Sequence, residues 1–139
     1  MSGLCYRFQV PGDDYSRAGE ASSTVKNRLK RLGGSPEAIR RVSIALYEGE
    51  INMVIHGGGG EVTVTVIPDR VDMVLEDHGK GIPDIEKAMQ EGYSTASEEA
   101  RSLGFGAGMG LPNMKKYTDT MQIESTVGVG TTVRMTVLL

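Results

Sequence analysis

Hydrophobic side chains recur at helical spacing in the first third of the chain and at strand spacing in several later segments. Residues 4–10 are typical of a strand, and residues 16–32 are typical of an amphipathic helix that two glycines end. The apolar stripe of this helix contains Ala18, Ala21, Val25, Leu29 and Leu32. The pattern therefore predicts a strand followed by a helix.

A second helix is predicted from Ser35 to about His56. Ser35 is a favourable N-cap residue, and Pro36 suits the first helical position because no hydrogen bond is lost there. Four glycines at 57–60 end the helix. Its apolar stripe contains Ile39, Val42, Leu46 and Met53.

Two hairpins are predicted in the remainder of the chain. Residues 61–67 alternate valine with threonine, as in a half-buried strand, and residues 71–76 follow after a short turn. Residues 121–126 and 131–138 form a second pair of strands around a glycine-rich turn. Each pair is expected to be antiparallel.

The segments between the hairpins complete the predicted fold. Residues 84–91 favour a short helix, residues 92–107 a long polar loop, and residues 109–118 a further helix. A loop of that length is typical of a lid or of disorder. The order of elements predicts one α+β domain over residues 1–139. We expect a two-layer sandwich with a mixed, mostly antiparallel sheet and helices on one face.

Composition narrows the class of protein. The net charge is −3, whereas a nucleic-acid surface needs a basic excess. No apolar run approaches the roughly 18 residues of a membrane span, and the N-terminus lacks a signal-peptide pattern. The single cysteine, Cys5, cannot form an internal disulfide. We therefore expect a cytoplasmic protein that contacts neither nucleic acid nor membrane directly.

Three polar side chains, Glu48, Asn52 and His56, share one face of the second helix because they lie four residues apart. A solvated face is the simpler interpretation, although the helix also carries Glu50, which we expect on the solvent side. His56 is expected to be a helix-end or structural histidine rather than a ligand. The alternative is chemical: an asparagine oxygen can hold Mg²⁺, and a nearby carboxylate can deprotonate a nucleophile in phosphoryl transfer.

Twelve of the 19 glycines lie in four clusters, at 57–60, 79–81, 104–110 and 128–130, and one cluster follows an acid at a strand end. Asp77 precedes Gly79 and Gly81, where a tight turn leaves room for a flat ring against the backbone. The carboxylate can accept a hydrogen bond from the adenine amine, although an ordinary β-turn has the same composition. Thr131 begins the last strand and can offer its hydroxyl to a ring nitrogen or a water.

A second glycine cluster leads into the helix at 109–118. Exposed backbone amides at a helix start can hold phosphate, although a flexible loop is the alternative interpretation. The spacing fits neither a dinucleotide fingerprint nor a P-loop. Lys115, Lys116 and Arg101 are expected to be solvated. The alternating glycines are Gly104, Gly106, Gly108 and Gly110.

In this order, the motifs resemble those of the GHKL (Bergerat-fold) ATPase superfamily over about residues 36–139. Residues 45–57 look like the N box, and the resemblance makes Glu48 the catalytic base and Asn52 the magnesium ligand. Residues 77–82 look like the first glycine box, whose aspartate reads the adenine amine.

The second glycine box, which closes on phosphates, is matched by residues 104–111. The resemblance thus implies a Bergerat fold that uses ATP and Mg²⁺. The residues it assigns to the nucleotide are Asn52, Asp77, Gly79, Gly81, Ile82, Gly104, Gly106, Gly108, Met109, Gly110, Leu111 and Thr131.

Within this superfamily the compact chain is similar to the bacterial anti-sigma factor and serine-protein kinase group. That likeness implies a serine/threonine kinase that phosphorylates a small STAS-type anti-sigma-factor antagonist. A sigma factor is a further expected partner, and a homodimer can form through the first strand and helix. Two alternatives stay open: a non-catalytic, nucleotide-dependent binding module that holds a sigma factor or other regulator, and the stand-alone ATPase domain of a two-component histidine kinase.

Gly49 and Glu50 depart from the N-box pattern, which more often has small or apolar residues there. A glycine inside a helix costs about 1 kcal/mol relative to alanine. Close packing against Gly49 is one explanation, and a weaker helix is the other.

Overall fold

The computed structural model describes residues 3–12, 17–55, 58–79, 81, 82, 85, 89 and 110–139, and its strands form a five-stranded sheet. The sheet order is β1-β2-β3-β5-β4, and every neighbouring pair is antiparallel. The strands are β1 (Leu4–Pro11), β2 (Gly59–Ile67), β3 (Arg70–Asp77), β4 (Thr120–Thr126) and β5 (Gly130–Leu138).

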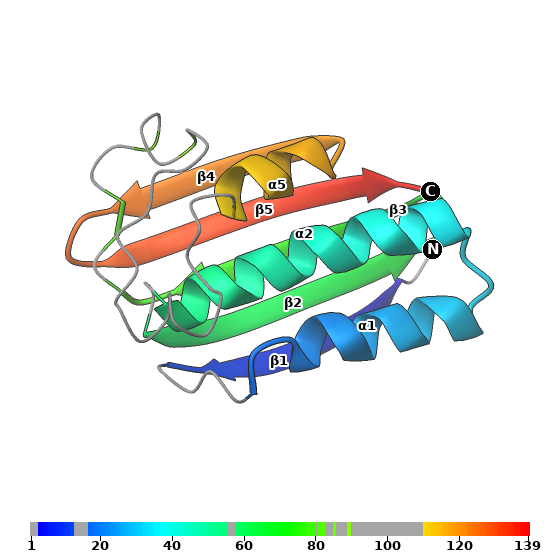
Figure 1. Cartoon of the computed structure of the whole chain (residues 1–139), viewed down its shortest axis with the longest axis horizontal. Coiled ribbons are helices and arrows are strands. Elements are labelled where there is room, and N and C mark those ends of the chain that lie inside the picture. Colours follow the sequence, from blue (N-terminus) through cyan, green and yellow to red (C-terminus); the bar gives the residue numbers. More distant parts are fainter. Residues whose placement is uncertain are drawn as a thin grey trace.

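In the described part of the chain, three helices lie on one face of this sheet (Figure 1). They are α1 (Glu20–Arg31), α2 (Pro36–Ile55) and α5 (Gly110–Lys116). The predicted two-layer α+β sandwich is therefore confirmed. None of the described helices has the length and apolar character needed to cross a membrane.

The core lies between the helices and the sheet, as the two hydrophobic periods predict. In β2, Val62 and Val64 are buried, while Thr63 between them is half-buried and faces the other side. In α2, Val42 and Leu46 are fully buried against this sheet face. Helical and strand periodicity therefore meet in one continuous apolar cluster.

The predicted start of the second helix is confirmed by its cap. The Ser35 hydroxyl accepts the Ala38 backbone N–H at 3.2 Å, and Pro36 is the first helical residue. This bond satisfies one of the amide groups that a helix start leaves without an internal partner.

The first helix begins later than residues 16–32 predict. It starts at Glu20, after Gly19, whose φ of 97° is in the left-handed region. Leu32 lies beyond the end of the helix and is 51% exposed. The apolar stripe located the helix, but it could not show that a glycine turn delays its start.

Glu50 caps this helix from a different element, and its expected place on the solvent side is wrong. Its side chain is 2% exposed. Its carboxylate accepts backbone N–H groups from Gly19 at 2.9 Å, Ala21 at 3.1 Å and Ser22 at 3.1 Å. The start of α1 has no side-chain cap of its own, so Glu50 on α2 supplies the missing acceptor.

Close packing explains Gly49, and no weakening of α2 is needed. A Cβ at this position would overlap Cδ2 of Leu75 and lie 3.2 Å from Cε of Met114. The glycine therefore lets α2 approach both β3 and α5.

Replacing Gly49 with valine is expected to destabilise the protein by about 1–3 kcal/mol, because both added methyl groups enter a filled core. Urea unfolding measures the change. Gly34→Ala is the control: its Cβ would lie no closer than 3.4 Å to its neighbours, so a change within about 0.5 kcal/mol is expected. An unaltered unfolding midpoint for the valine variant would show that Leu75 and Met114 move aside at no measurable cost in stability.

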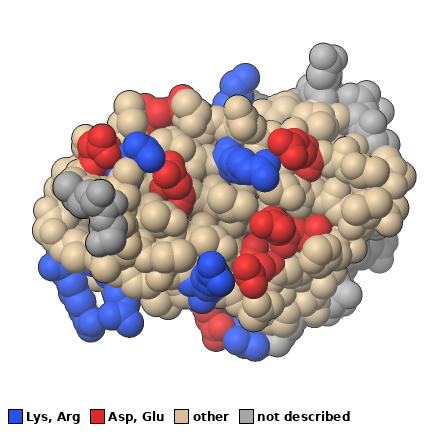
Figure 2. Space-filling view, turned by 180° about the vertical axis from the view of Figure 1, so that it is seen from behind, with Lys and Arg blue, Asp and Glu red and all other residues tan. Residues whose placement is uncertain are grey.

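The second face of the sheet is not covered by any described helix (Figure 2). Acidic and basic side chains are interspersed on it, as in the 3.2 Å ion pair between Arg134 and Glu124.

At the other end of β4, Asp119 accepts the Leu138 backbone N–H at 2.7 Å and pairs with Arg41 at 3.3 Å. These bonds hold the pKa of Asp119 below its usual value.

Both predicted hairpins are confirmed as β2–β3 and β4–β5. The last helix ends at Lys116, two residues before the predicted end. Of the short helix predicted at 84–91, the structure describes Ile85 and Met89, which share a helical backbone bond of 3.0 Å. The predicted lid at 92–107 lies outside the described residues.

Candidate functional site

Asp77 is fixed at the end of β3 by two backbone amides. Its Oδ1 accepts the N–H of Gly79 at 3.1 Å and the N–H of Thr131 at 3.0 Å. The second bond forms because β5 runs beside β3 and begins at the level of Asp77. Oδ2 receives no hydrogen bond from the described residues, so one oxygen of a positioned carboxylate is available to a ligand.

A serine that the sequence did not single out joins this group. The Ser125 hydroxyl accepts the Ile82 N–H at 2.7 Å, lies 2.8 Å from the Thr131 hydroxyl and is 3.3 Å from the Gly130 carbonyl oxygen. The register of the predicted hairpin could have identified it, since Ser125 pairs directly with Thr131. A serine within a strand carries no local pattern that marks it as a site residue.

Gly81 and Gly130 allow these segments to approach one another. Gly81 has a φ of 79°, and a Cβ there would lie 2.5 Å from the Thr126 carbonyl oxygen. Gly130 has a φ of 148°, and its Cβ would overlap the Asp77 carbonyl oxygen. A side chain at either position would therefore separate the turn after Asp77 from the β4–β5 hairpin.

A second polar group lies where α2 meets α5. Glu48 and Asn52 are both half-buried on α2, as their spacing predicted. Asn113 Nδ2 donates to Glu48 Oε1 at 3.4 Å, and Asn52 Nδ2 donates to the Met114 sulfur at 3.8 Å. Asn113 was not predicted, because nothing in its local sequence links it to Glu48.

The two groups lie at the same end of the sandwich. Gly60 pairs with Asp77 across β2 and β3. A Cβ at Gly60 would lie 2.8 Å from Cε of Met53 and 2.9 Å from Cα of Asp77. Met53 neighbours Asn52 on α2, so the Asp77 turn adjoins the helix that carries Glu48 and Asn52.

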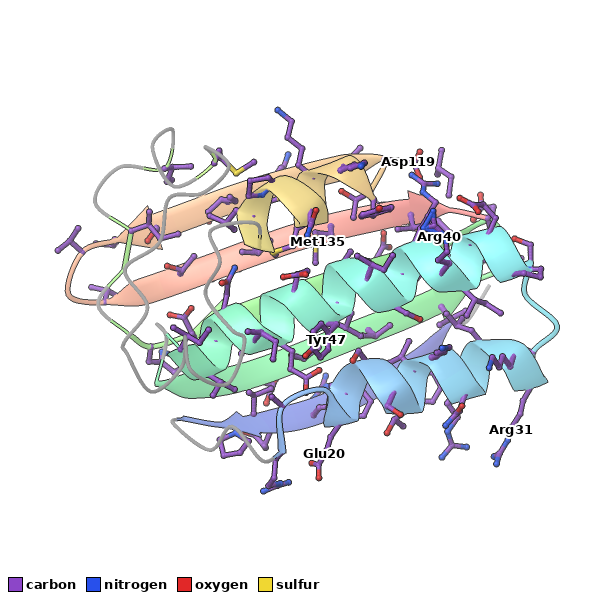
Figure 3. The ribbon with its side chains drawn as sticks, viewed as in Figure 1. Glu20, Arg31, Arg40, Tyr47, Asp119 and Met135 are labelled. Atoms are coloured by element: carbon purple, nitrogen blue, oxygen red, sulfur yellow. The ribbon has the colours of Figure 1, made fainter. Side chains whose placement is uncertain are left out.

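Tyr47 lies on α2 near the start of α1 (Figure 3). A Cβ on Gly19 would be 3.2 Å from its ring. Burial, together with the charges of Glu48 and Glu50, raises the pKa of Tyr47. Two carboxylates of α2 thus act on one ring from the same stretch of helix.

The polar side chains of this site fit a metal ion that takes one ligand from the protein and most of its ligands from a bound substrate. Among the described residues no three His, Cys, Asp or Glu side chains gather into a metal cluster. The Asn52 amide uses its Nδ2 on Met114, which leaves its Oδ1 for a hard cation. Mg²⁺ commonly takes one or two protein oxygens and completes its shell with phosphate and water.

The structure reaches only the end of the second glycine cluster. Gly110 is the first residue of α5, and Leu111 is 9% exposed and packs in the core. Lys115 and Lys116 are exposed, as expected. The other residues of interest lie outside the described part of the chain: His56, Arg101, Gly104, Gly106, Gly108 and Met109.

The sequence matches the family described as "Histidine kinase-like ATPase domain" over residues 13–137. The chain belongs to this family. The resemblance to GHKL ATPases is thereby confirmed. The predicted group within that superfamily is confirmed as well, because relatives of this chain include proteins named as anti-sigma factors and a protein named as a serine/threonine-protein kinase.

One such relative is the "Anti-sigma F factor" of Thermoanaerobacter sp. (strain X514), 39% identical over 84% of this chain and 81% of its own length. Another is "Serine/threonine-protein kinase RsbT" of Bacillus subtilis (strain 168), 32% identical over 78% of this chain and 79% of its own length. The chain is thus a member of the anti-sigma factor and serine-protein kinase group.

A solved structure supports the fold independently. The crystal structure titled as the SiaB-SiaC complex from Pseudomonas aeruginosa contains a chain with a TM-score of 0.57 and 12% identity. The match covers 98% of this chain and 89% of that one. At this identity the likeness concerns the fold alone.

Proposed function

We propose that this protein is an ATP- and Mg²⁺-dependent serine/threonine kinase that phosphorylates a small STAS-type anti-sigma-factor antagonist in the cytoplasm. In this proposal Asp77 and Thr131 read the adenine, with Gly79, Gly81 and Ile82 forming the turn beside it. Glu48 is the catalytic base and Asn52 the magnesium ligand. The glycines at 104–110 hold the phosphates.

The observation that carries the proposal is the arrangement of Asp77. Its Oδ1 is committed to two backbone amides, and its Oδ2 is left as an acceptor suited to an exocyclic amine. Gly60 and Met53 link this acceptor to α2, where Glu48 and Asn52 share one face. Base recognition and phosphoryl chemistry thus have separate groups at one end of one domain.

The positions of the chain's residues support the roles proposed for them. Glu48 is held by Asn113 through one oxygen, so its carboxylate is oriented to take a proton from an incoming serine hydroxyl. Asn52 presents its Oδ1, which suits Mg²⁺, and that ion when bound neutralises charge on the phosphates. Met114 holds the other end of the Asn52 amide.

Labelled ATP and Mg²⁺, incubated with the protein and candidate STAS partners, test this function. The expected product is acid-stable phosphate on a partner serine. Acid-labile phosphate would instead indicate the ATPase domain of a two-component kinase. Partner binding that depends on nucleotide without any transfer would indicate the binding module. Sigma-factor binding and a homodimer stay predictions from the resemblance.

Replacing Asp77 with asparagine is expected to lower ATP affinity about 10- to 100-fold, because an amide N–H₂ can take the place of the free acceptor and face the adenine amine. The remaining amide oxygen can still accept from Gly79 and Thr131, so the melting temperature should change little. Calorimetric titration with ATP measures the affinity.

Asp72→Asn is the matched control, since Asp72 lies on the same strand and bonds the Thr136 hydroxyl on the uncovered side of the sheet. Its ATP affinity should equal that of the wild type. If the ATP affinity of Asp77→Asn also equalled that of the wild type, the adenine would bind elsewhere.

A further inference from the structure

α5 lies beside the turn of α2 that carries the candidate catalytic groups, and two successive residues of α5 contact that turn (Figure 1). Asn113 donates from Nδ2 to Glu48 Oε1 at 3.4 Å. The sulfur of Met114, which is 1% exposed, accepts from Asn52 Nδ2 at 3.8 Å. A Cβ on Gly49 would lie 3.2 Å from Met114 Cε, so the glycine lets the two helices come this close. The buried neighbour of Asn113 thus fixes where Asn113 meets Glu48.

The direction of the bond between Asn113 and Glu48 follows from the chemistry of the two groups. An ionised carboxylate only accepts hydrogen bonds, so the nitrogen of the amide is the end that faces it. Glu48 is half-buried, and within the described part of the chain Oε1 takes this one bond while Oε2 takes none. One carboxylate oxygen is therefore held, and the other is open to a proton.

We propose that Asn113 is a positioning residue for phosphoryl transfer, which holds the Glu48 carboxylate so that Oε2 meets the hydroxyl of the partner serine. This role rests on the proposed function, in which Glu48 is the base. In the transfer the serine proton passes to Glu48 Oε2 and the serine oxygen bonds to the γ-phosphorus. The bond between that phosphorus and the bridging oxygen breaks, and ADP leaves with the electron pair. Asn113 makes none of these bonds and acts through Glu48.

The bond matters because a glutamate side chain has several rotatable bonds, and few of its conformations present an oxygen to the incoming hydroxyl. A hydrogen bond to a charged group is stronger than one between neutral groups, so an amide donor can restrict that freedom. Poor alignment of a reacting group lowers the rate of the chemical step. The loss of Asn113 should therefore slow transfer and spare ATP binding, since the adenine is bound at Asp77.

Single-turnover transfer of labelled phosphate by the whole chain, with ATP titration of the same variants, tests this role. Asn113→Asp keeps the size of the side chain and suits the first turn of α5, but it offers only acceptors to Glu48. It is expected to lower the transfer rate about tenfold or more, with ATP affinity within about twofold of wild type and little change in melting temperature. Lys115→Ala is the control, since Lys115 is exposed on the same helix, and it should transfer at the wild-type rate.

A double variant shows whether Asn113 acts through Glu48. Adding Asn113→Asp to Glu48→Gln should lower the rate no further, because the base that Asn113 holds is already absent. If the two losses multiplied, Asn113 would act elsewhere and the role would be overturned. Asn113→Ala removes the donor without adding a charge, so it serves the same comparison if the aspartate variant does not fold, and it should also slow transfer.

The outcomes separate this inference from the proposed function. If Glu48→Gln transfers phosphate at the wild-type rate, the base assignment and this inference fail together. If Glu48→Gln is slow while both Asn113 variants transfer at the wild-type rate, this inference alone is overturned. A fall in ATP affinity as large as the fall in rate would overturn it too, since Asn113 would then act in nucleotide binding.

Discussion

Replacing Glu48 with glutamine is expected to slow phosphoryl transfer to the partner by about 10²- to 10⁴-fold, which is the usual contribution of a positioned general base. The amide has the shape of the carboxylate, and its oxygen can still accept from Asn113, which lies 3.4 Å from Glu48 Oε1. What is lost is the capacity to take the serine proton. ATP affinity should stay within about twofold of wild type, because the adenine is bound at Asp77 and not at Glu48.

Single-turnover transfer of labelled phosphate, together with ATP titration of the same variant, measures both quantities. Glu37→Gln is the control, since Glu37 lies on the first turn of the same helix and is exposed. It should transfer phosphate at the wild-type rate. If Glu48→Gln transferred phosphate at the wild-type rate, Glu48 would have no part in the mechanism. If it lost ATP affinity as strongly as transfer rate, Glu48 would instead act in nucleotide binding.

Local rules were enough to predict most elements of the fold. The alternation of Val62, Thr63 and Val64 placed β2 with its buried side toward the helices, because a strand has a period of two. Ser35 and Pro36 placed the first turn of α2, because capping involves neighbours in the sequence. Each of these signals lies within a few residues of the feature that it predicts.

The errors and omissions come from contacts between distant residues. Glu50 and Gly19 are 31 positions apart, so no local pattern could show that one caps the helix after the other. Asn113 and Glu48 are 65 positions apart, and Ser125 and Ile82 are 43 apart. Periodicity places a side chain on a face of its own element, but it does not reveal which polar group faces it.

The candidate site shows the same division. The motifs named Asp77, Glu48 and Asn52, and the structure brings their segments together at one end of α2. Asn113, which contacts Glu48, could be found only from the position of α5 beside α2. Ser125, which contacts Thr131, could be found only from the register of β4 with β5. Motifs thus named the candidate groups, and packing showed which side chains contact them.

Replacing Glu50 with alanine is expected to destabilise the protein by about 3 kcal/mol or more. Three backbone N–H groups at the start of α1 lose their acceptor, and two of these bonds are buried. A buried donor without a partner costs about 1–3 kcal/mol. For a domain of this size the loss corresponds to a fall in melting temperature of roughly 10 °C. Thermal unfolding followed by circular dichroism measures it.

Two further variants distinguish capping from simple charge near the helix start. Glu20→Ala removes an exposed acid from the first turn of α1 and should cost no more than about 1 kcal/mol. Glu50→Gln keeps one acceptor oxygen but turns an N–H₂ toward the backbone donors, so its stability should lie between wild type and Glu50→Ala. If Glu50→Ala were no less stable than Glu20→Ala, the link between α1 and α2 would depend on apolar packing, with residues such as Val25 and Leu46 holding the helices together.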